Sequence, residues 1–73
     1  MSEPIQRKIY LTDLERDLTF SGFVKSFVES GKTMDIVLLD VKVYEYSSSN
    51  FLYAAPEIAV SRPKSALHIE DVK

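Results

Sequence analysis

The 73-residue chain contains no cysteine, one histidine and only two glycines. Without cysteine it forms no disulfide, and a single histidine argues against a structural zinc site, which takes four protein ligands. Two glycines are too few for a phosphate-binding glycine loop. A domain this small has a limited core, disulfides are excluded, and the sequence argues against a structural metal. We therefore expect partner subunits to contribute to its stability.

Long apolar runs are also absent, and no segment approaches the roughly 18 residues of a membrane helix. Met1–Pro4 lacks the apolar centre of a signal peptide. The formal net charge of −2 argues against a general nucleic-acid coat, although it leaves room for a local basic patch. We expect an intracellular protein, in the nucleus, the cytoplasm or both, with no membrane partner.

Residues arranged for catalysis are missing as well. No Ser/His/Asp constellation follows a recognisable motif, and His68 has no second histidine or cysteine with which to share a metal. Glu70 and Asp71 are adjacent on a strand and therefore point to opposite faces. We expect no enzyme, no catalytic residue, no metal, no cofactor and no small-molecule substrate.

What the chain does contain is a central hairpin pattern over Gly22–Asp40. Before the turn, apolar residues from Leu18 to Val28 alternate with polar residues from Thr19 to Glu29, as in a half-buried strand. Ser30–Thr33 has turn chemistry, because Gly31 can take the positive φ of a tight hairpin. After the turn, Ile36–Leu39 is apolar without alternation, which predicts a strand covered on both faces.

Shorter strand patterns flank this hairpin. They lie at Arg7–Thr12, at Phe51–Ala55 with the same strand resuming at Ile58–Val60, and at Ala66–Val72, separated by turn-like segments at 13–17, 47–50 and 61–64. Pro56 has no N–H to donate, so it predicts a sheet edge or a break. With no helix pattern, the fold class is all-β: a small, five-stranded, strongly bent antiparallel barrel. We expect residues 1–5 to form a loose arm and residues 6–73 a single domain.

Gly22, Phe27 and the run Met34–Asp40 resemble the first signature of the Sm/LSm family, in which a glycine and a phenylalanine precede Met-Asn, alternating aliphatic residues and Asp. The bacterial Hfq branch is echoed more weakly in three segments, Ile9–Leu11, Ser26–Phe27 and Val60–Pro63. The resemblance implies rings or partial rings, in which the fourth strand of one subunit pairs with the fifth of its neighbour. It implies a role in RNA processing, such as mRNA splicing, or in ribonucleoprotein assembly.

Two positions depart from the family pattern. Asp35 stands where the family has an asparagine that helps to hold an RNA base, and a carboxylate has no N–H to donate. Arg62-Pro63-Lys64 stands near the place of the family's second signature, Arg-Gly followed by Asn or Asp. The resemblance is therefore closest to Gemin-type or decapping-enhancer Sm folds, which have lost residues of the RNA pocket.

The candidate RNA-binding residues are Lys32, Asp35, Arg62 and Lys64. Asp35 is either an altered RNA contact or an acid that accepts hydrogen bonds from nearby backbone amides. Asp40 either orients the pocket or faces solvent. The cations, Lys25 included, form either a phosphate-binding patch or an ordinary solvated surface.

The candidate partner interface lies on two strands that carry little charge. Its residues are Phe51, Leu52, Tyr53 and Ala54 on one strand and Leu67, His68 and Ile69 on the other. Aromatic residues also gather around the serine-rich turn, at Tyr44, Tyr46, Phe51 and Tyr53. They either stack on bases or pack as cross-strand pairs.

Three functional hypotheses follow. The leading one is an Sm/LSm-like protein–protein module of an RNA-processing or ribonucleoprotein-assembly complex, whose partners are other Sm/LSm-like subunits or the same chain. The second is a ring-forming LSm/Hfq-like subunit, which adds RNA as a partner. The third is a Tudor- or SH3-like module that binds a peptide through the tyrosine cluster.

Overall fold

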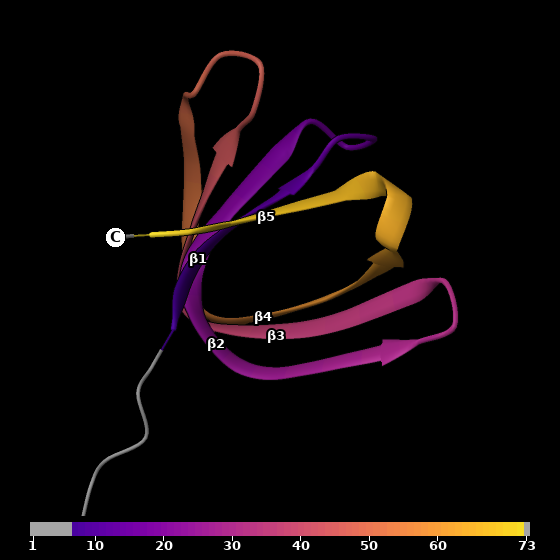
Figure 1. The fold of residues 1–73 in the computed structure, drawn as a ribbon. Coiled ribbons are helices and arrows are strands. Elements are labelled where there is room, and N and C mark those ends of the chain that lie inside the picture. Colours follow the sequence, from indigo (N-terminus) through magenta and orange to yellow (C-terminus); the bar gives the residue numbers. More distant parts are fainter. Residues whose placement is uncertain (1–6, 73) are drawn as a thin grey trace, which may run out of the picture.

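The computed structural model of the chain describes residues 7–72, so the arm expected at residues 1–5 lies outside the described part. The strands are β1 (Lys8–Asp13), β2 (Leu18–Ser30), β3 (Thr33–Glu45), β4 (Phe51–Pro63) and β5 (Leu67–Asp71), with a single 3₁₀ turn, η1 (Lys64–Ala66), before β5 (Figure 1). This confirms the all-β prediction. Residues 7–72 contain no helix of the length and hydrophobicity that crossing a membrane requires.

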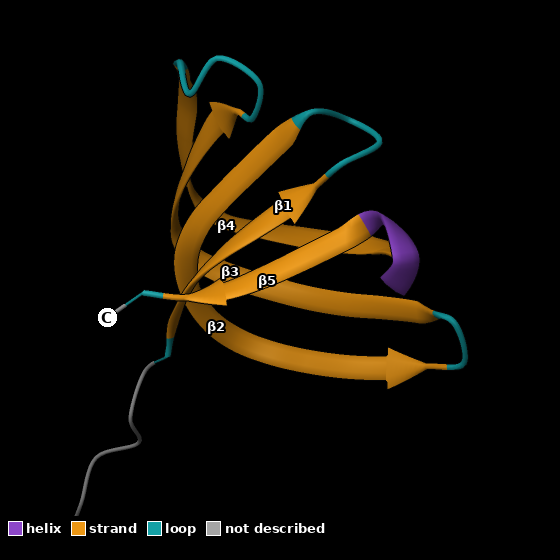
Figure 2. Ribbon diagram, turned by 45° about the horizontal axis from the view of Figure 1, so that its top comes forward, coloured by secondary structure: helices purple, strands orange, loops and turns teal. Residues whose placement is uncertain are grey.

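All five strands belong to one antiparallel sheet with the order β4-β3-β2-β1-β5. Figures 1 and 2 show that β2, β3 and β4 each curve sharply along their length, as the sequence predicts for the long strands. Within residues 7–72, no ladder joins β4 to β5, which are the two outer strands. The sheet is therefore open between them, and closure into a barrel stays a prediction.

The bend depends on close approach of β2 and β3 at Gly22. The register between these strands shifts between Ser21 and Phe23, which makes Gly22 part of a bulge. A Cβ atom on Gly22 would lie 2.9 Å from the carbonyl oxygen of Leu39 and 3.3 Å from the Cγ2 atom of Val41. Only glycine lets the two backbones approach this closely.

In β3 the bend continues at Asp40, which has a φ of 52°. Asp40 lies between the β3–β4 pairs Leu39–Glu57 and Val41–Ala55, so Pro56 stands opposite it. The predicted break at Pro56 is wrong, because β4 runs without interruption from Phe51 to Pro63. The other option for Pro56, a sheet edge, is correct, since β4 is an outer strand.

The core comes mainly from β3. The buried hydrophobic residues of the core are Ile9, Leu11, Phe20, Met34, Ile36, Leu38, Val41, Val43 and Val60. The alternation of β3 changes phase at Asp40, because the left-handed residue there turns the following side chains over. Val37 and Leu39 are only half-buried, so the prediction that Ile36–Leu39 is covered on both faces is wrong.

The predicted faces of β2 hold only in part. Val28, expected on the core face, is 55% exposed. Ser21 lies on the outer face as expected, opposite the exposed residues Tyr10 and Lys42, although its neighbours leave it only 6% exposed. Strand β1 pairs with β2 only over Leu18–Phe23, so the segment Lys25–Ser30 extends past β1 and lies open to solvent. The turn after it agrees with the prediction, since Gly31 has a φ of 59°.

Candidate functional site

The predicted RNA-binding residues come together where the β2–β3 turn meets the end of β4. The backbone N–H of Lys64 donates to the carbonyl oxygen of Lys32 over 2.8 Å. Met34 pairs with Arg62 in the β3–β4 ladder, and Asp35 pairs with Ser61. Lys32, Asp35, Arg62 and Lys64 therefore share one end of the molecule although they span half of the chain.

Most of these charges already have partners within the protein. Lys64 lies 2.9 Å from a carboxylate oxygen of Glu29. Asp35 accepts a hydrogen bond from the hydroxyl of Ser61, so its partner is a side chain rather than the backbone amides expected. Lys32 is exposed and makes no ion pair with any residue in the range 7–72. Asp40 is also exposed, at the bend of β3 rather than among these residues.

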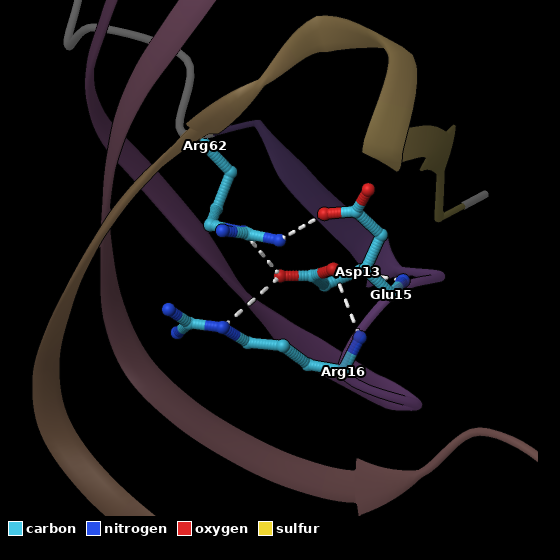
Figure 3. A network of polar contacts seen from close by, with 4 residues as sticks. All are labelled: Asp13, Glu15, Arg16 and Arg62. Carbon is cyan, nitrogen blue, oxygen red and sulfur yellow. Dashed lines mark hydrogen bonds and ion pairs between the residues drawn. The ribbon is translucent and has the colours of Figure 1, made fainter.

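Arg62 takes part in a network around Asp13, a residue that was not among the predicted site residues (Figure 3). The Nε atom of Arg62 donates to Oδ2 of Asp13 over 3.0 Å, and its Nη2 atom donates to Glu15. The backbone N–H groups of Glu15 and Arg16 donate to Oδ1 of Asp13 over 3.1 and 3.2 Å. The network therefore holds the β1–β2 turn against the end of β4.

Because Asp13 is buried, removing Arg62 from this network would be costly in free energy. The Asp13 side chain is 1% exposed and the Arg62 side chain 20% exposed. A phosphate that took Arg62 away would leave the Asp13 carboxylate buried without its main cation, which costs several kcal/mol. The only sequence signal for this role is an Asp directly before a turn, which commonly accepts hydrogen bonds from the next backbone amides.

The two outer strands differ in what they present. On β4, the exposed fractions of Phe51, Leu52 and Tyr53 are 56%, 45% and 50%, and Ala54 is also exposed. On β5, His68 is exposed while Leu67 and Ile69 pack partly against the core. The predicted interface residues therefore lie on the outer strands, but the exposed apolar side chains belong to β4.

An ion pair joins Arg7 to the far end of β5. Arg7 donates from Nε and Nη2 to the two carboxylate oxygens of Asp71. The hydrogen bond to Asp71, followed by the attraction of its charge, raises the pKa of the Arg7 guanidinium. Arg7 is cationic at neutral pH in either case, and both side chains are more than half exposed, so this pair contributes little to stability.

The tyrosines form a hollow on the outer side of the sheet. An open depression of about 340 Å³ is lined by Tyr10, Thr19, Tyr44, Glu45, Tyr46 and Ser49. Tyr44 and Phe51 form the cross-strand pair expected, with ring centroids 5.7 Å apart and ring planes at 69°. Tyr53 pairs with Val43 and does not line the hollow.

Tyr10 was missed because it lies far from the other tyrosines in the chain. It comes from β1, where Ile9 and Leu11 on either side of it are fully buried. Strand alternation alone would have placed Tyr10 on the outer face. Its position beside the β3–β4 turn depends on the register of β1 with β2 and of β2 with β3, which the sequence does not show.

In comparisons with protein-family models, with curated proteins and with solved structures, nothing matched this chain. The likeness to the Sm/LSm family therefore rests on the residues of the central hairpin.

Proposed function

We propose that this chain is an Sm/LSm-like protein–protein module that associates by pairing of edge strands, within an RNA-processing or ribonucleoprotein-assembly complex such as one that assembles snRNPs. The observation that carries the proposal is the strand order, with β4 and β5 on the outside of one antiparallel sheet. Each outer strand has a row of N–H and C=O groups directed away from the sheet, which can pair with another chain.

Side chains on β4 support the same role. Phe51, Leu52 and Tyr53 form an uncharged, exposed segment, whereas solitary edge strands are commonly protected by charge. A neighbouring β5 strand added here would cover these side chains. The partner is another Sm/LSm-like subunit or a second copy of this chain.

A barrel-like closure of the curved sheet belongs to the same proposal. Two contacts join the end of β4 and the following η1 turn to the end of β1 and the residue after it: the Arg62–Asp13 ion pair, and a hydrogen bond of 2.9 Å from the N–H of Leu14 to the carbonyl oxygen of Ala66. Contacts of this kind close the core at one end without a ladder between β4 and β5. The outer edges then stay available for neighbours.

The RNA-processing context rests on the resemblance of Met34–Asp40 to the Sm/LSm signature. A protein–protein role is preferred over RNA binding because Asp35 lacks donors and Arg62 is held by the buried Asp13. The alternative, a ring-forming LSm/Hfq-like RNA-binding subunit, is favoured by the gathering of Lys32, Arg62 and Lys64 at one end of the sheet.

Light scattering on the purified chain, with and without a short U-rich or A-rich RNA, tests this proposal. We expect a mass that RNA does not change. If the chain self-associates, L52K should lower the mass towards that of one chain, because a lysine on β4 opposes strand addition. V28K is the matched control, since Val28 is a similarly exposed apolar strand residue outside β4.

Two results would contradict the proposal. A six- or sevenfold mass that shifts when RNA is added would favour the RNA-binding ring. An oligomer whose mass is the same in wild type, L52K and V28K would show that association does not use the β4 edge.

A further inference from the structure

The tyrosine hollow is lined by four separate elements, three of which supply its tyrosines, and it is held in shape by hydrogen bonds. Tyr10 comes from β1, Tyr44 from the end of β3, and Tyr46 from the β3–β4 turn. The ring of Phe51 packs edge-on against Tyr44 from the neighbouring strand. Aromatic side chains from several elements thus face one depression.

Asp17 fixes the turn that carries Tyr46. Its carboxylate accepts the N–H of Ser47 over 2.8 Å and the hydroxyl of Ser47 over 2.7 Å, and its carbonyl oxygen accepts the N–H of Tyr46 over 2.9 Å. The N–H of Ser49 donates to the carbonyl oxygen of Glu45 over 2.7 Å. A turn held at this many points is ordered before a ligand arrives, which lowers the entropy lost on binding.

Glu45 gives the lining a negative charge. The hydroxyl of Ser48 donates to one of its carboxylate oxygens, which orients the group. Because a carboxylate accepts up to about four hydrogen bonds, it keeps capacity for a ligand. Tyrosine faces attract cations, and a carboxylate beside them adds to that attraction while repelling phosphate.

We propose that the tyrosine hollow binds an organic cation carried by a side chain of a partner protein. The cation is of the weakly hydrated kind, a guanidinium or a methylated ammonium, because these lose less hydration than a plain ammonium when they enter an aromatic site. The site lies on β1, β2, β3 and the β3–β4 turn rather than on the outer strands, so it does not depend on edge pairing.

Titration of ¹⁵N-labelled chain with three short peptides tests the site. The peptides are identical except for a central arginine, trimethyllysine or unmodified lysine. We expect saturable shifts at the amides of Tyr10, Glu45, Tyr46 and Ser49, with at least one of the first two peptides binding about threefold to tenfold more tightly than the lysine peptide. Which of the two binds better identifies the cation.

Matched variants separate the hollow from the rest of the surface. Y46A should abolish saturable binding, while Y53A should leave it unchanged, because Tyr53 is similarly exposed but lies outside the lining. E45Q should weaken binding about threefold or more and leave the fold intact, since glutamine still accepts the Ser48 hydrogen bond. Lys42 pairs with Ser21 next to the hollow, so K42Q should leave cation binding equal or stronger.

Several outcomes overturn the proposal. One is a neutral peptide, with a tert-butyl group in place of trimethylammonium, that binds as well as the cation. Another is binding that survives in Y46A or is unaffected by E45Q. A third is the absence of any saturable shift with peptides, together with shifts on addition of uridine monophosphate that weaken in K42Q. That result would assign the hollow to a nucleotide.

Discussion

At the scale of single residues, Asp13 stands out because, among the residues described, it is the one charged side chain that is fully buried. Its carboxylate is buried, and it accepts hydrogen bonds from two backbone amides and from Arg62. The D13N variant keeps an oxygen for the amides but presents an N–H towards the guanidinium. We expect it to lower the free energy of unfolding by about 2 to 3 kcal/mol, measured by urea denaturation.

Two further variants test the reason for that loss. E57Q changes a carboxylate to an amide in the exposed pair with Lys25 and should cost less than about 1 kcal/mol. The double variant D13N/R62L removes the guanidinium as well and should recover part of the stability lost in D13N. Strictly additive losses in the double-mutant cycle would contradict direct coupling between Asp13 and Arg62.

At the scale of elements, the β3–β4 turn depends on a residue from the β1–β2 turn. Asp17 has a φ of 58°, which glycine adopts without strain, so D17G removes the carboxylate and leaves the backbone free to keep its conformation. Each hydrogen bond lost is worth roughly 1 kcal/mol. We expect the Ser47 amide to exchange with solvent about fivefold faster, as measured by NMR hydrogen exchange.

The neighbouring elements provide the control for this variant. D17N retains one side-chain oxygen and should give an intermediate rate, and amides in the β1–β2 ladder should be unaffected by either change. Unchanged protection of Ser47 in D17G would mean that the Asp17 side chain does not hold the turn.

At the scale of the whole molecule, the sequence predicted the fold class and the strands, but it did not predict how the side chains of β3 divide between the two faces of the sheet. Alternation and turn residues located five strands, and Gly31 gave the hairpin turn, because these depend on local backbone preference. The phase change at Asp40 was invisible, since an exposed aspartate in a strand pattern does not reveal a positive φ. The run Ile36–Leu39 looked like a strand buried on both faces because Val37 and Leu39, which are only half-buried, are also apolar.

For the candidate sites, too, the sequence predicted groups of residues that are near one another in the chain and missed groups that are not. Residues of adjacent strands, such as Tyr44 and Phe51, could be grouped from their spacing around one turn. Asp13 with Arg62, and Tyr10 with Tyr46, come from distant parts of the chain. That these residues lie close together depends on the strand order and on the bend at Gly22, which no local pattern encodes.

Because the sheet has two free outer strands, it also predicts how one chain pairs with the next in an assembly. If β4 of one chain pairs with β5 of another, the interface is heterologous, and each chain has one donor edge and one acceptor edge. A variant blocked on β4, L52K, still offers β5. A variant blocked on β5, H68K, still offers β4. Each alone should be monomeric, because the complementary edge is blocked in every copy.

Mixing the two variants in equal amounts should therefore give a species with twice the mass of one chain, which light scattering measures. The wild-type chain, if it self-associates, should form larger assemblies under the same conditions, because both edges of every copy remain open. A mixture that stays monomeric while the wild type assembles would exclude β4–β5 pairing. Dimers of L52K with itself would instead point to an isologous contact through a single kind of edge, since only a symmetric interface survives when every copy carries the same block.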